Sequence, residues 1–598
     1  MKTKLLIVGG GPAGLAGAIA AAESGVDVLV VDEGLELGGQ LVKQTHKFFG
    51  HQGFFASKRG VEIAKILRDR AKNLGVKYML QTTLVGFYED TAVAYSRKDD
   101  KTYEIDYDYV LLATGASEKF LVFKNNMLPG VYGAGAVQTL MNQYGVLPGE
   151  DFLIIGAGNI GLIVAYQIAQ AGGNVRAVVE ISDKVGGYEV HANKIRRMGI
   201  PILLRHTIIK AIGKDRVKGA VIAKVDENFK VIEGTEREIV ADTICLSVGL
   251  QPSIELASQL GVEMVYIPEL GGHVPKRDEN MRTSKKNIFV AGDLSGIEEA
   301  TSAMAEGYIA GYTIAQDITG KDLSEEIDKY KEELADLRRG PFGKKIRSGL
   351  EKMGITLPSG GYRTDLQKDF GPAGKLRAVM ECHQNIPCNP CEAVCPTDAI
   401  NMGGNINGIP HINYDKCVGC MVCVMKCPGL AIFMVQEFDE YSVVGIPYEF
   451  EPLPDVGDKV ILMNRNGEDV GEGVIQRVIK NRKDKTHVVY VAMEKGLEKV
   501  VRHFRIPSFE EDEIVCRCEE VTKKDIEKAI DMGFTDFEEL RRYLRIGMGP
   551  CGGRTCRLIT MGILVRKTGK SMEEISNMNL RPPSIPISFG SILRGEKE

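Results

Sequence analysis

The sequence predicts an α/β protein with two parallel α/β folds of the same kind, followed by smaller cysteine-rich domains. Two observations predict the α/β part: a glycine-rich turn between an apolar strand and a helix occurs near the N-terminus and again near residue 156. A third observation predicts the rest, since twelve of the thirteen cysteines lie after residue 380. At roughly 100–200 residues per domain, the 598 residues correspond to about three to six domains.

The composition excludes several classes of protein. Apolar residues make up 44% and charged residues 26%, as in ordinary soluble globular proteins. The net charge of −5 leaves no basic excess to neutralise phosphates, so a nucleic-acid partner is not expected. The cysteine count is odd and the cysteines are clustered, unlike a secreted disulfide scaffold, so ligation of metal or clusters is favoured.

The N-terminus resembles a secretory signal, with a basic start, an apolar run and small residues. A signal peptide needs neither the glycines at Gly9, Gly11 and Gly14 nor the second strand that ends in an acid. No run of about 18 uncharged apolar residues occurs, so no transmembrane segment is expected. We expect a cytoplasmic protein that could reach a membrane only through partners.

The first glycine turn predicts a Rossmann-like dinucleotide site. We expect a strand at Lys4–Val8, a turn at Gly9–Gly14, a helix through Ala22, a strand at Val26–Val31, and then Asp32-Glu33. In this pattern the first glycine allows the tight turn, the second lets backbone N–H groups approach a pyrophosphate, and the third lets the helix pack on the sheet. Asp32 lies 23 residues after Gly9, where a carboxylate can accept from ribose hydroxyls.

Three further segments indicate which dinucleotide binds. Two buried strands end in small-residue turns, at Tyr109–Gly115 and Asn287–Asp293, a small-residue helix follows at Ala300–Ala315, and Gly38-Gly39-Gln40 comes after the ribose acid. These segments resemble the flavin-binding segments of the thioredoxin-reductase-like and pyridine nucleotide-disulphide oxidoreductase superfamily. The resemblance implies FAD, with Asp293 near the ribityl or phosphate region. The FAD set is Gly9, Gly11, Pro12, Ala13, Gly14, Asp32, Glu33, Gly39, Gln40, Thr114, Gly115, Gly292 and Asp293.

A second fold of the same kind is inserted between these pieces. A strand at Phe152–Ile155, a glycine turn, a helix to Ala171 and a strand at Val175–Val179 precede Glu180. An acid at this place accepts from ribose hydroxyls and repels a 2′-phosphate, which favours NAD over NADP. The alternatives are another adenine nucleotide or a scaffold without ligand. The second set is Gly156, Gly158, Asn159, Ile160, Gly161 and Glu180.

The flavin part of the sequence has no catalytic cysteine pair. Disulfide reductases of the superfamily carry CxxC or CxxxxC near the flavin, whereas Cys245 is the only cysteine before residue 380, and we expect it to be buried and inert. No catalytic residue is therefore assigned. By the geometry of the superfamily, the segment after Gln40 runs near the isoalloxazine, so Lys43 and His46 are candidates for the flavin pocket, with solvated loop residues as the alternative.

Residues 381–435 predict two 4Fe–4S clusters. The run Cys417-x2-Cys420-x2-Cys423-x3-Cys427-Pro428 is typical of a cluster site, in which the fourth cysteine reaches the other cluster, and it is unlike the separated CxxC pairs of zinc sites. The preceding arm resembles the bacterial two-cluster ferredoxin, except that five residues separate its first two cysteines. By the crossover of that family, one cluster takes Cys382, Cys388, Cys391 and Cys427, and the other takes Cys395, Cys417, Cys420 and Cys423. Cys382 follows the family pattern least well, and His383 is interpreted as a loop residue.

The last third of the chain predicts a β module and a third cluster. Residues 436–508 alternate short apolar runs with turns, as a small β-barrel does, and contain no cysteine. Cys516, Cys518, Cys551 and Cys556 resemble the bacterioferritin-associated ferredoxin type of 2Fe–2S domain, with zinc as the alternative ligand. Glycines at 549 and 552 are expected to let backbone N–H groups turn toward the sulfurs.

The whole order of domains resembles the alpha-type subunits of heteromeric flavoprotein dehydrogenases, such as dye-linked L-proline dehydrogenase, opine and sarcosine oxidases, and anaerobic glycerol-3-phosphate dehydrogenase. The resemblance implies an FAD-dependent oxidoreductase subunit that relays electrons from an amine-oxidase-like partner flavoprotein to a one-electron acceptor. A self-sufficient NADH-dependent reductase is the alternative, and an assembly scaffold without FAD is the third hypothesis. The expected domains are 1–118 with 248–320 (FAD), 119–247 (nucleotide), 321–380 (linker), 381–435 (two 4Fe–4S), 436–508 (barrel), 509–565 (2Fe–2S) and 566–598 (tail).

Overall fold

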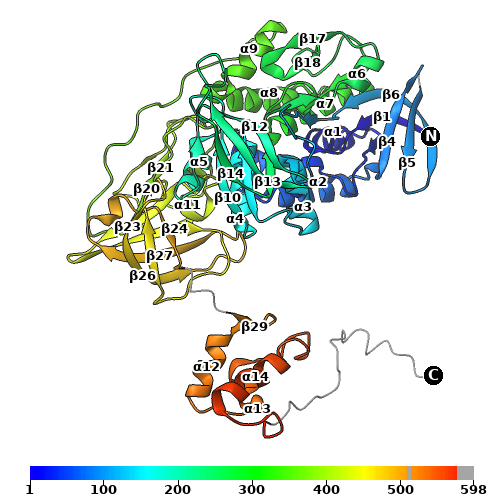
Figure 1. Cartoon of the computed structure of the whole chain (residues 1–598). Coiled ribbons are helices and arrows are strands. Elements are labelled where there is room, and N and C mark those ends of the chain that lie inside the picture. Colours follow the sequence, from blue (N-terminus) through cyan, green and yellow to red (C-terminus); the bar gives the residue numbers. More distant parts are fainter. Residues whose placement is uncertain (90, 508–512, 576–598) are drawn as a thin grey trace. The chain divides into compact units, whose positions relative to one another are not determined.

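The computed structural model describes residues 1–89, 91–507 and 513–575 (Figure 1). It divides into two compact units, Met1–Ile506 and Pro507–Glu598, and each is described by itself. None of the helices in the described ranges combines the length and the apolar character that crossing a membrane requires.

The first nucleotide fold is a seven-stranded sheet in the order β3-β2-β1-β6-β5-β4, with β19 also paired to β6. The strands β1, β2, β3 and β19 run parallel to their neighbours, whereas β4, β5 and β6 form an antiparallel meander. The strands are β1 (Lys2–Val8), β2 (Val28–Val31), β3 (Lys77–Met79), β4 (Thr82–Tyr88), β5 (Thr91–Ser96), β6 (Lys101–Leu112) and β19 (Ile288–Val290).

Two helices cross closely over this sheet because small residues lie where they meet. The helices are α1 (Pro12–Glu23) and α7 (Ala300–Thr319). A Cβ atom added to Gly307 would come 2.1 Å from Ala13 O, and one added to Gly311 would come 2.4 Å from Gly17 O. The glycines of α7 therefore bring the second half of the FAD fold against the first glycine-turn helix (Figure 1).

The second nucleotide fold is a five-stranded parallel sheet in the order β11-β10-β9-β15-β8. Its elements are β8 (Val131–Gly133), α3 (Ala134–Tyr144), β9 (Asp151–Ile155), α4 (Asn159–Gln170), β10 (Asn174–Val179), α5 (Glu189–Arg196), β11 (Ile202–Leu203) and β15 (Thr243–Leu246). A three-stranded sheet of β12 (His206–Gly213), β13 (Val217–Lys224) and β14 (Arg237–Val240) adjoins it. The antiparallel pair β7 (Ala116–Glu118) and β16 (Leu250–Pro252) lies where the inserted fold leaves and rejoins the first one.

The segment 321–380, which the sequence suggested as a linker, begins with two helices. They are α8 (Ser324–Arg339) and α9 (Lys344–Lys352). Ile327, Leu334 and Leu337 of α8 join the same hydrophobic core as α1 and α7, because one face of this otherwise charged helix is apolar. The first part of the segment is therefore packed against the FAD fold.

The cysteine-rich segment and the β module share one sheet. Its antiparallel order is β20-β23-β24-β27-β26-β25-β28, and the cysteines lie between β20 and β23. The strands are β20 (Arg377–Met380), β23 (Ile432–Glu437), β24 (Tyr441–Tyr448), β25 (Lys459–Met463), β26 (Asp469–Ile479), β27 (His487–Glu494) and β28 (His503–Arg505). The short helices α10 (Pro390–Ala393) and α11 (Val422–Lys426) and the strands β21 (Ile400–Asn401) and β22 (His411–Ile412) complete the cysteine-rich segment.

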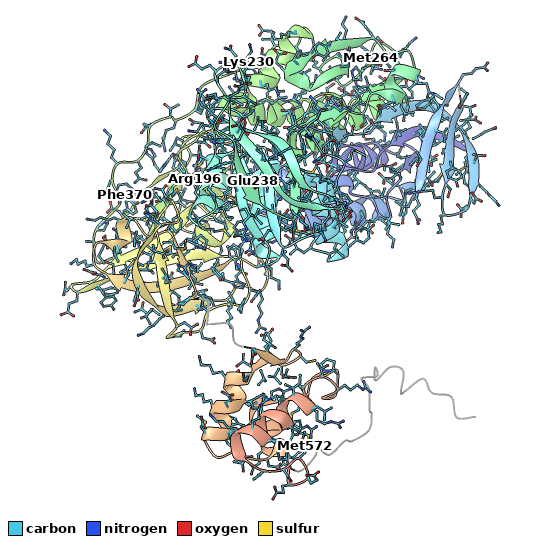
Figure 2. The ribbon with its side chains drawn as sticks, in the orientation of Figure 1. Arg196, Lys230, Glu238, Met264, Phe370 and Met572 are labelled. Carbon is cyan, nitrogen blue, oxygen red and sulfur yellow. The ribbon has the colours of Figure 1, made fainter. Side chains whose placement is uncertain are left out.

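This sheet packs against the second nucleotide fold. A Cβ atom added to Gly467, in the turn between β25 and β26, would come 2.4 Å from Arg196 O at the end of α5, and Arg196 is labelled in Figure 2. The Arg197 guanidinium, which is buried, donates to Leu430 O at 3.0 Å. The glycine is needed because the two backbones approach too closely for any side chain.

The second unit is a small helical domain. It contains β29 (Ile514–Cys516), β30 (Val521–Thr522), α12 (Lys523–Asp531), α13 (Phe537–Leu544) and α14 (Arg557–Thr568). Thr522 and Asp525 form a capping box on α12, and Asp536 and Glu539 form one on α13. These boxes satisfy N–H groups that the first turn of each helix leaves without partners.

Candidate functional site

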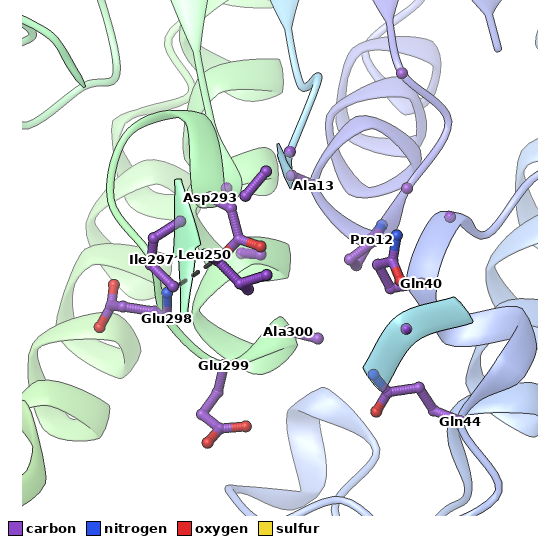
Figure 3. Close-up of a pocket in the computed structure, with 18 of the residues that line it drawn as sticks. Pro12, Ala13, Gln40, Gln44, Leu250, Asp293, Ile297, Glu298, Glu299 and Ala300 are labelled. Carbon is purple, nitrogen blue, oxygen red and sulfur yellow. Dashed lines mark hydrogen bonds between the residues drawn. The ribbon is translucent and has the colours of Figure 1, made fainter. Parts of the chain in front are cut away.

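One large cavity, of about 1790 Å³, lies between the two nucleotide folds. Figure 3 shows part of its lining, with Pro12 and Gln40 from one side and Asp293, Glu298 and Glu299 from the other. Most of the residues that the sequence nominated line it: Gly9, Gly11, Pro12, Ala13, Asp32, Glu33, Gly39, Gln40, Lys43, His46, Thr114, Gly115, Gly158, Asn159, Ile160, Gly292 and Asp293. Gly14, Gly156, Gly161 and Glu180 are not part of the lining and support the turns behind it.

The first glycine turn has the shape that a bound pyrophosphate needs. Gly9 has a φ of +100°, and a Cβ atom there would come 2.3 Å from Ala113 O. A Cβ atom at Gly14 would come 1.8 Å from Gly9 O, so this glycine lets α1 pack against the turn. Within the described part of the chain, no side chain caps the N-terminus of α1, which leaves its N–H groups for an anion. The residues therefore fit the diphosphate of FAD.

The two strand-end acids brace the glycine turns. Asp32 accepts from Gly10 N–H at 2.6 Å and from Gly34 N–H at 2.7 Å. Glu180 accepts from Ala157 N–H at 2.8 Å and from Ser182 N–H at 3.0 Å. In each fold the carboxylate joins the middle of the glycine turn to the residue two positions after itself.

A second glycine pair, Gly186-Gly187, which the sequence analysis does not assign, extends this likeness. Gly38 donates its N–H to Gly10 O at 2.8 Å, and Gly186 and Gly187 donate theirs to Ala157 O at 3.2 and 3.0 Å. Gly186 comes six residues after Glu180, as Gly38 comes six residues after Asp32. The repeated acid-x5-Gly-Gly spacing was the signal, and it shows that the second fold copies the flavin fold beyond the glycine turn.

Three carboxylates, those of Asp293, Glu298 and Glu299, lie together on the cavity wall. Burial raises the pKa of Asp293 to about 7, and its Oδ1 accepts from Glu298 N–H at 3.3 Å (Figure 3). Glu299 accepts from Asn159 Nδ2 at 2.8 Å, which ties the N-terminus of α7 to the glycine turn of the second fold. Burial also raises the pKa of Glu299.

An ion network lies behind these acids. The Glu306 carboxylate is buried and receives hydrogen bonds from Arg277 at 2.8 Å, Arg338 at 2.6 Å, Gly292 N–H at 2.9 Å and the Ser295 hydroxyl at 2.6 Å. Burial acts against the charged form, but the two arginines outweigh it and lower the pKa of Glu306. The network fixes the turn that carries Asp293.

The structure places both flavin-pocket candidates on the cavity wall. Lys43 donates to Gly135 O at 3.1 Å and to the Thr139 hydroxyl at 3.3 Å, and burial lowers its pKa. Burial, with Lys194 and Arg59 nearby, lowers the pKa of His46 to about 3. His46 is therefore neutral at pH 7, so of the two candidates only Lys43 offers a positive charge to the cavity.

Four cysteines line a second, smaller cavity. They are Cys382, Cys388, Cys391 and Cys427, which come from both arms of the cysteine-rich segment, and they are the four that the crossover places together. Among the residues that the structure describes, no three His, Cys, Asp or Glu side chains converge on a single metal-ion position. Four cysteine sulfurs around a cavity suit a cubane, in which cysteines bind a multi-iron cluster.

The two arms of this segment have the same local hydrogen bonds. Ala399 N–H donates to Cys395 Sγ at 3.2 Å, and Ala431 N–H donates to Cys427 Sγ at 3.4 Å. Each cysteine begins a Cys-Pro-x-x-Ala-Ile sequence, so the sequence repeat corresponds to a structural repeat. Cys417 and Cys423 are buried in one apolar core with the sheet, and Cys391, Cys395 and Cys427 pack at the margin of this core.

In the second unit, four cysteines come together in two contacts. Cys518 is hydrogen-bonded to Cys551, and Cys516 to Cys556. A Cβ atom at Gly549 would come 2.2 Å from Cys518 Cβ, which explains the glycine at this position. The N–H groups of Thr555, Gly553 and Arg554 donate to Cys551 and lower its pKa, so this loop favours a thiolate.

Cys245 lies apart from all of these groups, on β15. Its side chain is completely buried, and this burial raises the pKa of its thiol. The flavin part of the chain therefore has no reactive cysteine.

Comparison with known proteins gives three matches to protein families. The model described as pyridine nucleotide-disulphide oxidoreductase matches residues 3–307, just over half of the chain. A 4Fe-4S dicluster domain matches residues 386–431, and a sarcosine oxidase A3 domain matches 510–596, of which 510–512 and 576–596 lie outside the described residues.

Individual relatives are distant. Hydrogen cyanide synthase subunit HcnB of Pseudomonas aeruginosa is 27% identical over 59% of this chain and 78% of its own length. The sarcosine oxidase alpha subunit of Corynebacterium sp. is 27% identical over 53% of this chain, but this match spans only 32% of that longer protein. The crystal structure of L-proline dehydrogenase from P. horikoshii aligns with 99% of this chain and 79% of its own, at 18% identity and a TM-score of 0.45.

The family match covers both glycine turns and most of the residues that line the cavity between the two folds. The chain belongs to the pyridine nucleotide-disulphide oxidoreductase family and is an FAD-dependent oxidoreductase that carries a 4Fe–4S domain.

Proposed function

We propose that the chain is the electron-transferring subunit of a multisubunit dehydrogenase. In this proposal a partner flavoprotein of the amine-oxidase-like kind oxidises the substrate. The substrate is either an amino acid, such as proline, or glycerol-3-phosphate. This chain receives the electrons and passes them to a one-electron acceptor through its FAD and its clusters.

One observation carries the proposal: the flavin cavity and the cavity lined by four cysteines meet at a common wall, which Phe49 forms. When bound, FAD exchanges electrons singly or in pairs, whereas iron–sulfur clusters exchange them singly. A chain with both can convert two-electron chemistry into one-electron transfer. The lack of a reactive cysteine near the flavin supports this route, because electrons cannot leave through a disulfide.

The residues of the chain have distinct tasks in this proposal. The turn Gly9–Gly14 and the N-terminus of α1 hold the FAD diphosphate, and Asp32 stabilises the turn. Lys43 offers a positive charge on the cavity wall, where negative charge on a reduced flavin would be stabilised. Backbone N–H groups that donate to Cys395, Cys427 and Cys551 stabilise thiolate charge and so raise the potentials of the clusters.

We further propose three clusters. Two are 4Fe–4S clusters, one held by Cys382, Cys388, Cys391 and Cys427 and the other by Cys395, Cys417, Cys420 and Cys423. The third is a 2Fe–2S cluster held by Cys516, Cys518, Cys551 and Cys556. The hydrogen bonds of Cys516 with Cys556 and of Cys518 with Cys551 support the proposal that these four cysteines bind one cluster together.

Purification of the native protein tests the partnership. We expect a second flavoprotein to co-purify in a fixed ratio, and the complex to oxidise an amino acid or glycerol-3-phosphate with an artificial one-electron acceptor. The two relatives described above support this arrangement, because each is itself named as a subunit. Isolation of this chain alone, with full substrate-oxidising activity, would contradict it.

A second candidate function is a self-sufficient NADH-dependent reductase. The observation in its favour is that Gly158, Asn159 and Ile160 of the second glycine turn line the same cavity as the flavin residues. Under this hypothesis NADH binds to the second fold and reduces the flavin directly. Anaerobic NADH should then bleach the flavin absorbance of the isolated chain, and an unchanged spectrum rules the hypothesis out.

A further inference from the structure

The loop His46–Gly50 lies between the flavin cavity and the cavity lined by cysteines. His46, Phe48, Phe49 and Gly50 line the flavin cavity. Of the described residues, Phe49 alone lines both cavities. The loop comes from the FAD fold and follows Gln40, so it extends from the expected flavin position to the cysteines.

Aromatic rings continue the wall that Phe49 forms. The Phe49 ring meets the Tyr188 ring at 5.1 Å between centroids and the His191 ring at 5.2 Å, both edge to face. Tyr188 in turn meets Phe342 at 4.6 Å. Phe49 and Phe342 pack in the same apolar cluster as Cys382, Cys388 and Cys427, so the loop is in apolar contact with the part of the segment that carries these thiols.

The backbone of the loop also contacts the cysteines. Gly50 pairs with Cys388 in an isolated parallel bridge, and Asn389 N–H donates to Gly50 O at 3.3 Å. The Gly50 N–H donates to Cys388 Sγ. Gly50 has a φ of +109°, and a Cβ atom there would come 3.1 Å from Thr301, so this contact depends on glycine.

A buried lysine holds the loop in this position. Lys47 is 3% exposed, and its Nζ donates to the Thr486 hydroxyl at 2.5 Å and to Met425 O, two residues before Cys427. The loop is thus attached to the cysteine-rich segment on both sides of Phe49. A flexible surface loop would have neither attachment.

We propose that electrons pass between the flavin and the Cys382–Cys388–Cys391–Cys427 cluster at Phe49, which makes this cluster the one adjacent to the flavin. The inference rests on the proposed electron-transfer function and specifies its route. One electron crosses at a time: each crossing takes one electron from the reduced flavin and adds one to the oxidised cluster, which passes it on before the second arrives. The protons that the flavin loses as it is reoxidised leave to solvent, and no bond forms between flavin, Phe49 and cluster. Phe49 is a positioning residue that keeps the gap filled with packed atoms, because electron tunnelling slows steeply across empty space.

The test compares two neighbouring phenylalanines in the full chain loaded with FAD and iron–sulfur clusters. Phe49→Leu opens the shared wall, whereas Phe48→Leu is the matched control, because Phe48 lines the flavin cavity only and stacks on His46. Under anaerobic conditions a light flash reduces the bound flavin with EDTA as donor, and the visible absorbance then reports the flavin and the clusters. We expect Phe49→Leu to slow cluster reduction about tenfold, since the lost ring atoms leave a packing gap.

Further measurements distinguish a role of Phe49 in electron transfer from a general effect on the structure. FAD content, iron content and the midpoint potentials of Phe49→Leu should equal those of the wild type, and Phe49→Tyr, which keeps the ring, should restore the rate. If Phe49→Leu fails to hold iron, Phe49→Met takes its place in the comparison. Its flexible side chain adapts to the irregular site, while its fewer side-chain atoms still leave part of the ring volume empty, so cluster reduction should again be slower than in the wild type. A wild-type rate in Phe49→Leu, or equal slowing in Phe48→Leu, overturns the inference. If the wild-type flavin does not reduce the clusters at all, the proposed function itself fails.

Discussion

Asp32 and Glu180 occupy equivalent positions in the two nucleotide folds. Each carboxylate ends the second strand of its fold and accepts two backbone N–H groups, one from the glycine turn and one from the residue two positions further on. Each is followed by a glycine pair that returns to the same turn. The same substitution at the two positions should therefore weaken the binding of different ligands: FAD when Asp32 is changed, and the ligand of the second fold when Glu180 is changed.

Asp32→Ala should release FAD. The change leaves the N–H groups of Gly10 and Gly34 without their acceptor, and a lost hydrogen bond to a charged group costs about 1.5–3 kcal/mol. We expect FAD affinity to fall about tenfold to a hundredfold, measured as FAD per chain after dialysis. Glu180→Ala is the matched control and should keep its FAD, and equal FAD loss in both variants would contradict the assignment.

Cys382→Ala should remove one cluster and leave the others. The proposed clusters contain about ten iron atoms per chain, and we expect about four of them to be lost, together with one 4Fe–4S signal in the electron paramagnetic resonance spectrum. Cys245→Ala should leave the iron content unchanged, because Cys245 is buried on β15 away from the other cysteines. Full iron content in Cys382→Ala would show that this cysteine is not a ligand.

Gly549→Ala should disrupt the third cluster. A Cβ atom at this position would come 2.2 Å from Cys518 Cβ, so the loop must move away from a ligand. Gly562→Ala in α14 is the control: no atom of the described residues lies within 4 Å of a Cβ atom there, and alanine should favour the helix by up to about 1 kcal/mol. The 2Fe–2S absorbance should fall in Gly549→Ala only. If Gly549→Ala keeps this absorbance, the assignment of Cys518 as a ligand beside Gly549 is wrong.

Glu306→Gln should destabilise the FAD fold by about 3–5 kcal/mol, because it leaves Arg277 and Arg338 buried with reduced compensation. The exposed pair Lys65–Asp69 gives the control, since Asp69→Asn should cost at most about 1 kcal/mol. The temperature at which flavin fluorescence is released on heating reports the difference.

The pH dependence of Glu306→Gln follows from the sign of the pKa shift. The folded protein lowers the pKa of Glu306 below 4.5, so its charged form contributes stability above that pH. The difference between wild type and Glu306→Gln should therefore be constant near pH 7 and shrink only as the pH falls below about 4.5. A difference that grows on acidification would contradict this account of the network.

The sequence was informative where function depends on local spacing. The glycine turns, the strand-end acids and the cysteine runs are short-range patterns. The strands that flank the two glycine turns begin and end within two residues of the predicted bounds, as with Val26 against Val28 for the start of β2, whereas β6 begins at Lys101, eight residues before Tyr109. The sequence does not make the helix α8 evident, because charged residues dominate its composition. Its apolar positions Ile327, Leu334 and Leu337 nevertheless share one helical face.

Contacts between distant segments could not be predicted in this way. The Gly50–Cys388 bridge joins the FAD fold to the cysteine-rich segment, and no local pattern in either segment specifies it. The neutral state of His46 also follows from tertiary burial near Lys194 and Arg59. Where a residue acts through packing between domains, as Phe49 does, only the folded structure shows its place.

The most direct test of the central claim is flash photoreduction of the wild-type chain loaded with FAD and clusters, under anaerobic conditions. The account predicts that the electron paramagnetic resonance signals of reduced clusters appear as the flavin is reoxidised, without added mediator. The contradicting result is a flavin that stays reduced while clusters that dithionite can reduce remain oxidised.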